Sequence, residues 1–147
     1  MKRILTVMLA TAAAALPTTS LASASAGRAK LQLRKTSVGT ILANARGFTV
    51  YAFTKDGRNK DNCAKISGCL GLWPVVATSG KAIAGKGVRA SLIGTITLKG
   101  GTKQVTYAAH PLYTYAEDGG PGMTFYVNFF QFGGFWPALN AAGKEVK

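Results

Sequence analysis

The hexapeptide "YAFTKD" at residues 51–56 returns as "YTYAED" at 113–118, at an offset of 62 (113 − 51). Each copy has a Tyr, an aromatic residue two positions later and an Asp three positions after that. Further along, "GLWP" at 71–74 is matched by "GFWP" at 134–137, at an offset of 63 (134 − 71). Self-similarity at a fixed period indicates a duplicated structural unit. We therefore predict two similar repeats of about sixty residues, placed at about 38–76 and 92–146.

The composition of both repeats favours β structure. Short segments rich in Val, Ile, Thr and aromatic residues are separated by turns that contain Gly, and these segments are 37–42, 47–53, 93–98, 103–109 and 110–116. A short helix is expected around 63–72, closed by Pro74, and a helical turn near 88–92. The predicted fold is mainly β: a small antiparallel β domain with one or two short helical turns.

The spacing inside the hexapeptide predicts how its aromatic residues pack. In an extended segment Tyr51 and Phe53 point to one face, while Val50 and Ala52 point to the other. The second copy repeats this alternation with Tyr113 and Tyr115. We expect the aromatic residues of both copies, together with Trp73 and Trp136, to have a structural role in packed layers.

Two interpretations of the motif Asp residues remain open. Asp56 and Asp118 each precede a Gly, and Asp-Gly after a strand is a common turn signal. A turn would use each carboxylate as an acceptor for nearby backbone amides. The alternative is a duplicated catalytic group, which would require the two carboxylates to converge. We favour the turn.

The N-terminal residues 1–26 are predicted to be a signal peptide. They combine a basic start, an apolar stretch at 4–16 and the small residues Ala24, Ser25 and Ala26. Cleavage near Ala26 would leave 27–147 as a single secreted domain. No Cys lies near this site, so we expect a protein that is secreted or periplasmic, is not lipid-anchored and has no transmembrane segment after cleavage.

Positive charge dominates the remaining chain. Two of the 18 Lys and Arg residues lie in the first 26 and none of the 5 Asp and Glu residues does, so 16 − 5 leaves a net charge of +11. Such a balance suits polyanionic envelope polymers or anionic lipid, whereas the alternative is a role in solubility alone. The cations are scattered, so we expect no specific recognition of nucleic acid.

Cys63 and Cys69 are predicted to form a disulfide. They are an even, closely spaced pair in a chain predicted to enter an oxidising compartment. A c-type haem would need a two-residue gap between the Cys residues and a His after them, and neither is present. We expect no cofactor.

Three further segments carry a resemblance to a known family: "AGKGVRASLIGTI", "QVTYAAHPLYTYAED" and "FGGFWPALNAAGKEV". With the two hexapeptides they resemble the bacterial secreted proteins and predicted lipoproteins named for their Yx(FWY)xxD repeat, from about Val38 to Val146. The resemblance implies an extracytoplasmic location and a duplicated architecture, but no catalytic or ligand-binding residues. The chain departs from the family in lacking a lipobox Cys, in the apolar loop at 122–132 and in Pro137, where relatives often carry an aromatic residue.

One aromatic segment, 123–135, could bind a ligand or partner. Seven of its thirteen residues are aromatic or Met: Met123, Phe125, Tyr126, Phe129, Phe130, Phe132 and Phe135. We expect most of these side chains to be buried. The alternative is a hydrophobic groove that receives a lipid, a planar cofactor or a partner protein. The possible ligand site would comprise His110, Tyr113, Asp118, Phe129 and Phe130.

These observations favour a non-catalytic binding or structural module associated with the cell envelope. An extracytoplasmic hydrolase using Asp56, Asp118 and His110 is one alternative. A haem or metal carrier using His110 and a tyrosine is another. A lone His before a Pro more often has a structural role.

Overall fold

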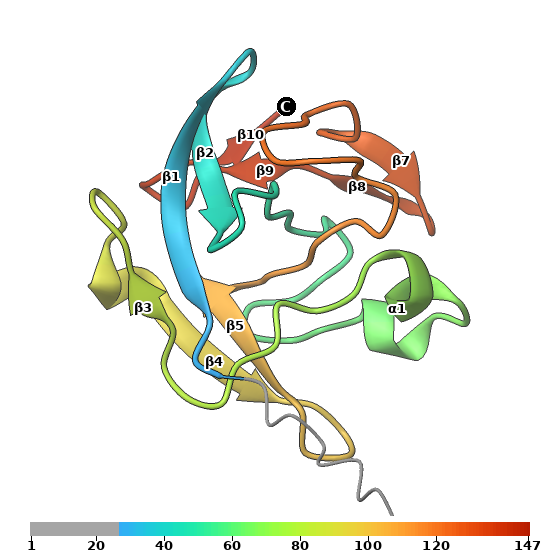
Figure 1. The fold of residues 1–147 in the computed structure, drawn as a ribbon. Coiled ribbons are helices and arrows are strands. Elements are labelled where there is room, and N and C mark those ends of the chain that lie inside the picture. Colours follow the sequence, from blue (N-terminus) through green and yellow to red (C-terminus); the bar gives the residue numbers. More distant parts are fainter. Residues whose placement is uncertain (1–26) are drawn as a thin grey trace, which may run out of the picture.

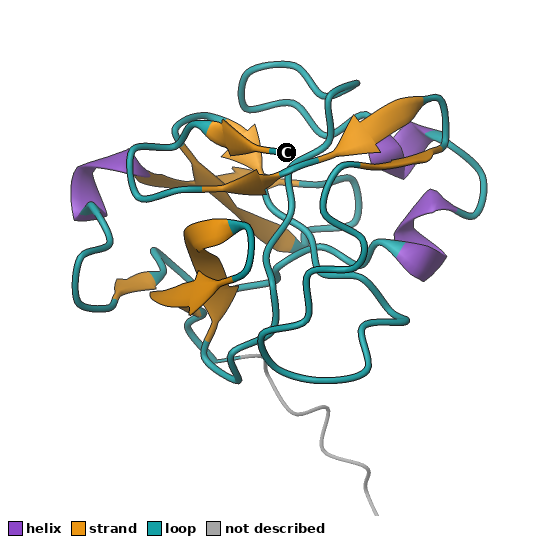
Figure 2. Ribbon diagram, turned by 90° about the horizontal axis from the view of Figure 1, so that it is seen from above, coloured by secondary structure: helices purple, strands orange, loops and turns teal. Residues whose placement is uncertain are grey.

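The computed structural model describes residues 27–147 (Figure 1). The predicted signal peptide 1–26 and its cleavage near Ala26 lie outside the described residues. Strands form several small sheets, and the short helices lie at the edges of the molecule (Figure 2). The strands are β1 Lys30–Thr36, β2 Gly39–Asn44, β3 Ile83–Ala84, β4 Ile93–Thr97, β5 Lys103–Tyr107, β6 His110–Pro111, β7 Phe129–Gln131, β8 Gly134–Trp136, β9 Ala138–Leu139 and β10 Glu145–Val146. The predicted mainly β fold is confirmed.

Each repeat begins with an antiparallel hairpin. In the first, β1 pairs with β2 from Leu31↔Asn44 to Thr36↔Gly39. In the second, β4 pairs with β5 from Ile93↔Tyr107 onwards. Strand β1 was not predicted, because the apolar residues in its basic and polar sequence are few. The predicted strand at 37–42 in fact begins at Gly39, after a turn.

The remaining strands are short. Two residues of β3 pair in parallel with β1, and β6 pairs with the end of β5. Two further antiparallel hairpins, β7–β8 and β9–β10, complete the second repeat. The predicted strand at 47–53 forms only isolated bridges, at Thr49 and Tyr51.

The predicted helical segments are present as three short elements. A 3₁₀ turn spans Cys63–Lys65, helix α1 spans Cys69–Leu72, and a second 3₁₀ turn spans Ala90–Leu92. Cys63 and Cys69 form the predicted disulfide, and both are fully buried. The disulfide thus fixes the first 3₁₀ turn to the start of α1.

Two adjoining cores confirm the alternation predicted for the hexapeptides. Val50 and Ala52 lie in a core that is mostly aliphatic, with Leu112 from the second repeat. Tyr51 and Phe53 lie in a core that is mostly aromatic. We call the latter the aromatic core, and its fully or nearly fully buried members are Tyr51, Phe53, Cys63, Cys69, Trp73, Tyr113, Tyr115 and Trp136.

The prediction that most side chains of the segment 123–135 are buried is wrong. Phe125 is 80% exposed, Phe130 59%, Phe135 45% and Phe129 40%. The reason is that β7 and β8 form a two-stranded hairpin with only one face against the aromatic core. Phe130 and Phe135 lie on the other face, which has no layer above it, whereas Phe129 lies on the face of Trp136 and is only partly covered.

Candidate functional site

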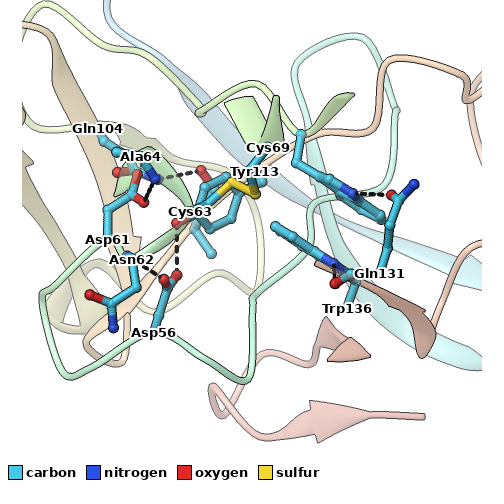
Figure 3. The surroundings of a disulfide bond; sticks show 12 residues. Asp56, Asp61, Asn62, Cys63, Ala64, Cys69, Gln104, Tyr113, Gln131 and Trp136 are labelled. Carbon is cyan, nitrogen blue, oxygen red and sulfur yellow. Dashed lines mark hydrogen bonds between the residues drawn. A yellow bond between two sulfur atoms is a disulfide. The ribbon is translucent and has the colours of Figure 1, made fainter. Parts of the chain in front are cut away.

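The tyrosine of each hexapeptide forms a hydrogen bond with the aspartate of the other. The Tyr51 hydroxyl donates to Asp118 Oδ2 at 2.9 Å, and the Tyr113 hydroxyl donates to Asp56 Oδ2 at 2.7 Å (Figure 3 shows the second pair). The same two tyrosines pair through their backbones, with N···O distances of 2.8 and 2.9 Å. Each repeat therefore supplies a phenol to the other repeat's carboxylate.

The tryptophans of the two repeats join a continuous stack of four rings. Trp73 and Trp136 lie parallel, with centroids 3.9 Å apart and planes 5° apart. Phe53 stacks on Trp136 at 4.1 Å, and Tyr115 packs on Trp73 at 4.2 Å. Each outer ring thus lies on the Trp of the other repeat. The second aromatic position of the motif therefore packs across the repeats.

The Tyr of each motif packs against the Trp of its own repeat. Tyr51 meets Trp73 edge-on at 5.2 Å, and Tyr113 meets Trp136 edge-on at the same centroid distance. Edge-to-face contacts are a favoured arrangement of aromatic rings. The Tyr, aromatic and Asp positions of the motif each have the same kind of partner in both copies.

Both indole N–H groups are satisfied by one residue of β7. Trp73 Nε1 donates to Gln131 Oε1 at 2.7 Å, and Trp136 Nε1 donates to the Gln131 carbonyl at 3.1 Å (Figure 3 shows the second bond). Buried indoles need such acceptors. The role of Gln131 could not be predicted from the sequence, because a polar residue in an aromatic segment carries no signal of its partner.

The expected turn role of the two carboxylates needs correction. Asp56 Oδ1 accepts from the Asn62 amide at 2.7 Å, six residues later, and so closes a wider loop than a turn. Asp118 Oδ1 is buried and has no hydrogen-bond partner among residues 27–147. In both hexapeptides the turn is closed by backbone: the Asp56 amide donates to the Phe53 carbonyl, and the Asp118 amide to the Tyr115 carbonyl. The shared role of the carboxylates is to bind the opposite tyrosine.

Burial shifts the titration of these groups. Loss of solvent raises the pKa of Asp56 to about 6 and that of Asp118 to about 6, although the tyrosine hydrogen bonds oppose the shift. Burial and the facing carboxylate both raise the pKa of Tyr51 and Tyr113. The phenols therefore remain protonated donors throughout the physiological range.

The residues proposed for hydrolysis do not share one cavity. Asp56 and His110 line a cavity of about 100 Å³ with Arg58. Asp118 lines a different cavity, of about 290 Å³, with Arg46. Burial chiefly lowers the pKa of His110, with a further contribution from Arg58 that Glu145 opposes.

The possible ligand site predicted from sequence is not assembled either. Tyr113 is fully buried and its hydroxyl binds Asp56, while Asp118 lines the larger cavity. Phe129 and Phe130 are exposed on β7. Within residues 27–147, no group of three or more His, Cys, Asp or Glu side chains could hold a metal ion.

A cationic cavity is a feature that sequence analysis missed. Arg28, Lys30 and Arg46 line a cavity of about 280 Å³ that includes no acidic residue. The Arg28 Nε donates to the Lys81 carbonyl at 2.8 Å, and the Arg46 guanidinium lies 4.8 Å from the centre of the Phe48 ring. No sequence signal could have located the cavity, because its cations are separated along the chain and meet only after β1 and β2 pair.

The few acidic residues do little to neutralise the protein surface. Asp61 and Asp118 are buried, and Asp56 is half-buried. Glu117 and Glu145 are the exposed acidic residues of the described chain, and Glu145 pairs with Lys147 at 3.6 Å. The exposed surface therefore carries an even larger excess of positive charge than the composition suggests.

Comparison with known proteins identifies two matching segments. A family model described as a secreted repeat of unknown function matches residues 32–77 and 94–140. These segments contain the two hexapeptides and both tryptophans. No curated protein and no solved structure gives a match. Residues 27–147 contain no helix with the length and apolar character needed to cross a bilayer.

Proposed function

Because the chain belongs to this family of secreted repeats, we propose that it is a non-catalytic module that binds an anionic component of the cell envelope. Cleavage near Ala26 would accompany export, without a lipid anchor. The protein would then meet anionic polymers and lipid headgroups directly, because both lie outside the cytoplasm.

The cationic cavity is the observation that carries this proposal. Three basic side chains line it, and no acidic residue lines it. Arg presents a planar fork of donors that matches phosphate and carboxylate groups, and Lys adds a point charge. A cavity of about 280 Å³ has room for one anionic group of a polymer. The surrounding cationic surface would attract the rest of the chain.

The engagement of the motif residues supports a non-catalytic role. Their hydroxyls, carboxylates and rings are used to join the repeats. A hydrolase that used Asp56, Asp118 and His110 together would have no common site, because Asp118 lines a different cavity from the other two. A haem or metal carrier that used Tyr113 would have to break its bond to Asp56.

Binding to heparin, used as a soluble polyanion, tests the proposal. We expect binding at physiological salt that weakens steeply as salt rises. The triple variant Arg28→Ala/Lys30→Ala/Arg46→Ala should bind about tenfold or more weakly, a loss typical of removing charge-assisted contacts.

A matched control separates the cavity from the overall charge. The variant Lys65→Ala/Lys86→Ala/Lys103→Ala removes the same charge at three exposed positions that do not line this cavity. It should lose much less affinity. Equal losses in the two triple variants would reject the cavity as the site, and absence of heparin binding by the parent would reject the function.

A further inference from the structure

Four exposed phenylalanines lie in or just before the β7–β8 hairpin of the second repeat. Phe129, Phe130 and Phe135 lie on the β7–β8 hairpin, and Phe125 lies in the loop before it. Phe130 and Phe135 are cross-strand partners whose ring centroids lie 5.0 Å apart. Exposed apolar patches of this kind mark interaction sites more often than isolated exposed residues do. We call these four residues the aromatic surface.

The hairpin is held firmly, so the exposure of these rings is a fixed feature. Thr54 of the first repeat makes two hydrogen bonds with Phe135. The Thr54 amide donates to the Phe135 carbonyl at 3.0 Å, and the Thr54 hydroxyl accepts from the Phe135 amide at 2.8 Å. Between β7 and β8, Phe132 and Gly133 have φ values of +56° and +80°, as a tight two-residue hairpin turn requires. A Phe is rare in this conformation and strained there. The side chain of Phe132 offsets that cost by packing on the aromatic core.

The exposed rings lie on both faces of the hairpin. Phe130 and Phe135 are one cross-strand pair, and Phe129 and Trp136 are the adjacent pair. Successive residues of a strand point to opposite faces, so Phe129 and Phe130 are directed apart. Because Phe129 shares the core-facing side of the hairpin with Trp136, the exposed rings do not form one flat surface for a rigid partner, whereas a fluid medium can surround each exposed ring. This geometry favours lipid over a protein surface.

The charge around the aromatic surface is complementary to anionic lipid. From Gly119 to Gly143 the sequence contains no charged residue, so no carboxylate of this segment opposes an anionic surface. The Lys55 side chain lies against the hairpin turn, within 3.8 Å of where a Cβ on Gly133 would be. Basic residues near a bilayer attract its anionic headgroups, while adjacent aromatic rings enter the interfacial region.

We infer that the aromatic surface inserts into the interface of an anionic phospholipid bilayer. The inference rests on the proposed function, because the cationic surface supplies the first attraction to the membrane. Charge alone would hold the protein at the headgroups with strong salt dependence. Insertion of the rings adds a contribution that salt does not screen.

Co-sedimentation with vesicles tests this inference. Vesicles of phosphatidylcholine that contain phosphatidylglycerol should bind the parent, and vesicles of phosphatidylcholine alone should bind it much less. Phe125→Ser/Phe130→Ser should lower the partition coefficient about 100-fold, which corresponds to about tenfold for each ring removed from lipid. Phe125→Leu/Phe130→Leu should retain most of the binding, because it keeps an apolar side chain at both positions.

Ile83→Ser is the matched control. Ile83 is 43% exposed and lies on β3, apart from the aromatic surface. Its replacement should leave the partition coefficient unchanged. Thermal melts should show that all variants remain folded, since both target rings are exposed. Heparin binding by the Ser variant should equal that of the parent.

The outcomes separate this inference from the proposed function. Unchanged vesicle binding by Phe125→Ser/Phe130→Ser would overturn insertion, and so would a parent that binds heparin but no vesicle. Absence of binding to both heparin and vesicles would reject the function and the inference together. If sedimentation velocity showed a parent dimer that the Ser variant loses, while vesicle binding stayed the same, the aromatic surface would belong to a second copy of the chain.

Discussion

At the scale of single residues, the two tyrosine hydroxyls of the motif differ in what their loss would leave behind. Tyr51→Phe would leave the carboxylate of Asp118 without a hydrogen-bond partner within residues 27–147, and Asp118 is only 8% exposed. Tyr113→Phe would leave Asp56 with its bond to the Asn62 amide. We expect losses of unfolding free energy of about 2–3 kcal/mol for Tyr51→Phe and about 1 kcal/mol for Tyr113→Phe. Urea denaturation measures both.

Tyr115→Phe provides the control for this comparison. It keeps the ring on Trp73 and removes a hydroxyl that takes no part in the exchange between Tyr and Asp. The first repeat already has Phe53 at the matching position. A loss for Tyr115→Phe as large as that for Tyr51→Phe would show that the bond to Asp118 is not the cause.

The raised carboxylate pKa values predict a pH dependence of stability. Since the pKa of Asp56 and Asp118 is about 6 in the folded protein and 3.8 ordinarily, the native state binds protons more tightly between these values. The stability that these groups contribute is present below the ordinary pKa and is lost as pH rises through 6. Asp56→Asn/Asp118→Asn should therefore gain melting temperature relative to the parent between pH 4.5 and 7.5.

Comparing these two proteins cancels the opposite effect of His110. The pKa of His110 is lowered in the folded protein, so its contribution is present above the ordinary pKa of 6.5 and is lost as pH falls through the region below it. Parent and variant share this group. A difference in melting temperature that is constant or shrinks from pH 4.5 to 7.5 would contradict the assigned shifts.

The motif residues show where sequence analysis succeeds and where it stops. Alternation along an extended segment placed Tyr51 and Phe53 in one core and Val50 in the other, because side-chain direction is a local property. The hydrogen bond from Tyr51 to Asp118 could not be predicted from the sequence, because it depends on how the two repeats pack together. The Asp-Gly turn signal was real, but backbone atoms close the turn and the carboxylate is free to bind the other repeat.

At the scale of elements, the same division separates the predicted strands from the missed ones. Strands β4 and β5 carry β-branched residues and were predicted within a few residues. Strand β1 is basic and polar, and its pairing with β2 and β3 makes it a strand. The exposure of the β7–β8 rings was misjudged because composition does not tell whether a second layer covers a hairpin. The cationic cavity likewise could not be predicted, because it depends on the pairing of β1 with β2.

The disulfide should stabilise the first repeat without taking part in binding. Replacing both cysteines by Ala should lower the unfolding free energy by about 2 kcal/mol, because the unfolded chain regains the freedom of a short closed loop. Chemical denaturation of the double variant measures the loss. Heparin affinity should stay unchanged, since neither Cys lines the cationic cavity.

Labelling gives a second measurement of the same element. The native protein should take up no thiol reagent, because Cys63 and Cys69 are bonded to each other and fully buried. Two labels per native molecule would show that the bond is absent in the exported protein. If the native protein takes up no label, an unchanged unfolding free energy in the Ala variant would show that the bond does not stabilise the fold.

At the scale of the whole molecule, the four-ring stack predicts that both repeats unfold together. Trp73→Phe leaves Trp136 as the sole tryptophan, and Trp136→Phe leaves Trp73. Each variant should lose about 1–3 kcal/mol, because the ring is smaller and Gln131 loses an indole donor. In both variants the fluorescence of the remaining Trp should follow the same melting transition as circular dichroism.

The two variants test cooperativity from opposite sides, because each retained Trp reports on a different repeat. Coincident transitions in both would show one cooperative unit. A fluorescence midpoint that differs from the circular dichroism midpoint in either variant would show that one repeat melts alone. The exchange of partners between the repeats would then contribute little to stability.

The exchange of Tyr and Asp partners also bears on how such a chain could originate. A polypeptide with only one repeat would carry a phenol, a carboxylate and a Trp face whose partners all lie on a second copy. Two such chains would satisfy each other as a homodimer with two-fold symmetry. Gene duplication and fusion would convert that dimer into the present chain. The two halves could then diverge in sequence. One descendant half could then acquire a disulfide loop, while the other acquired an aromatic hairpin.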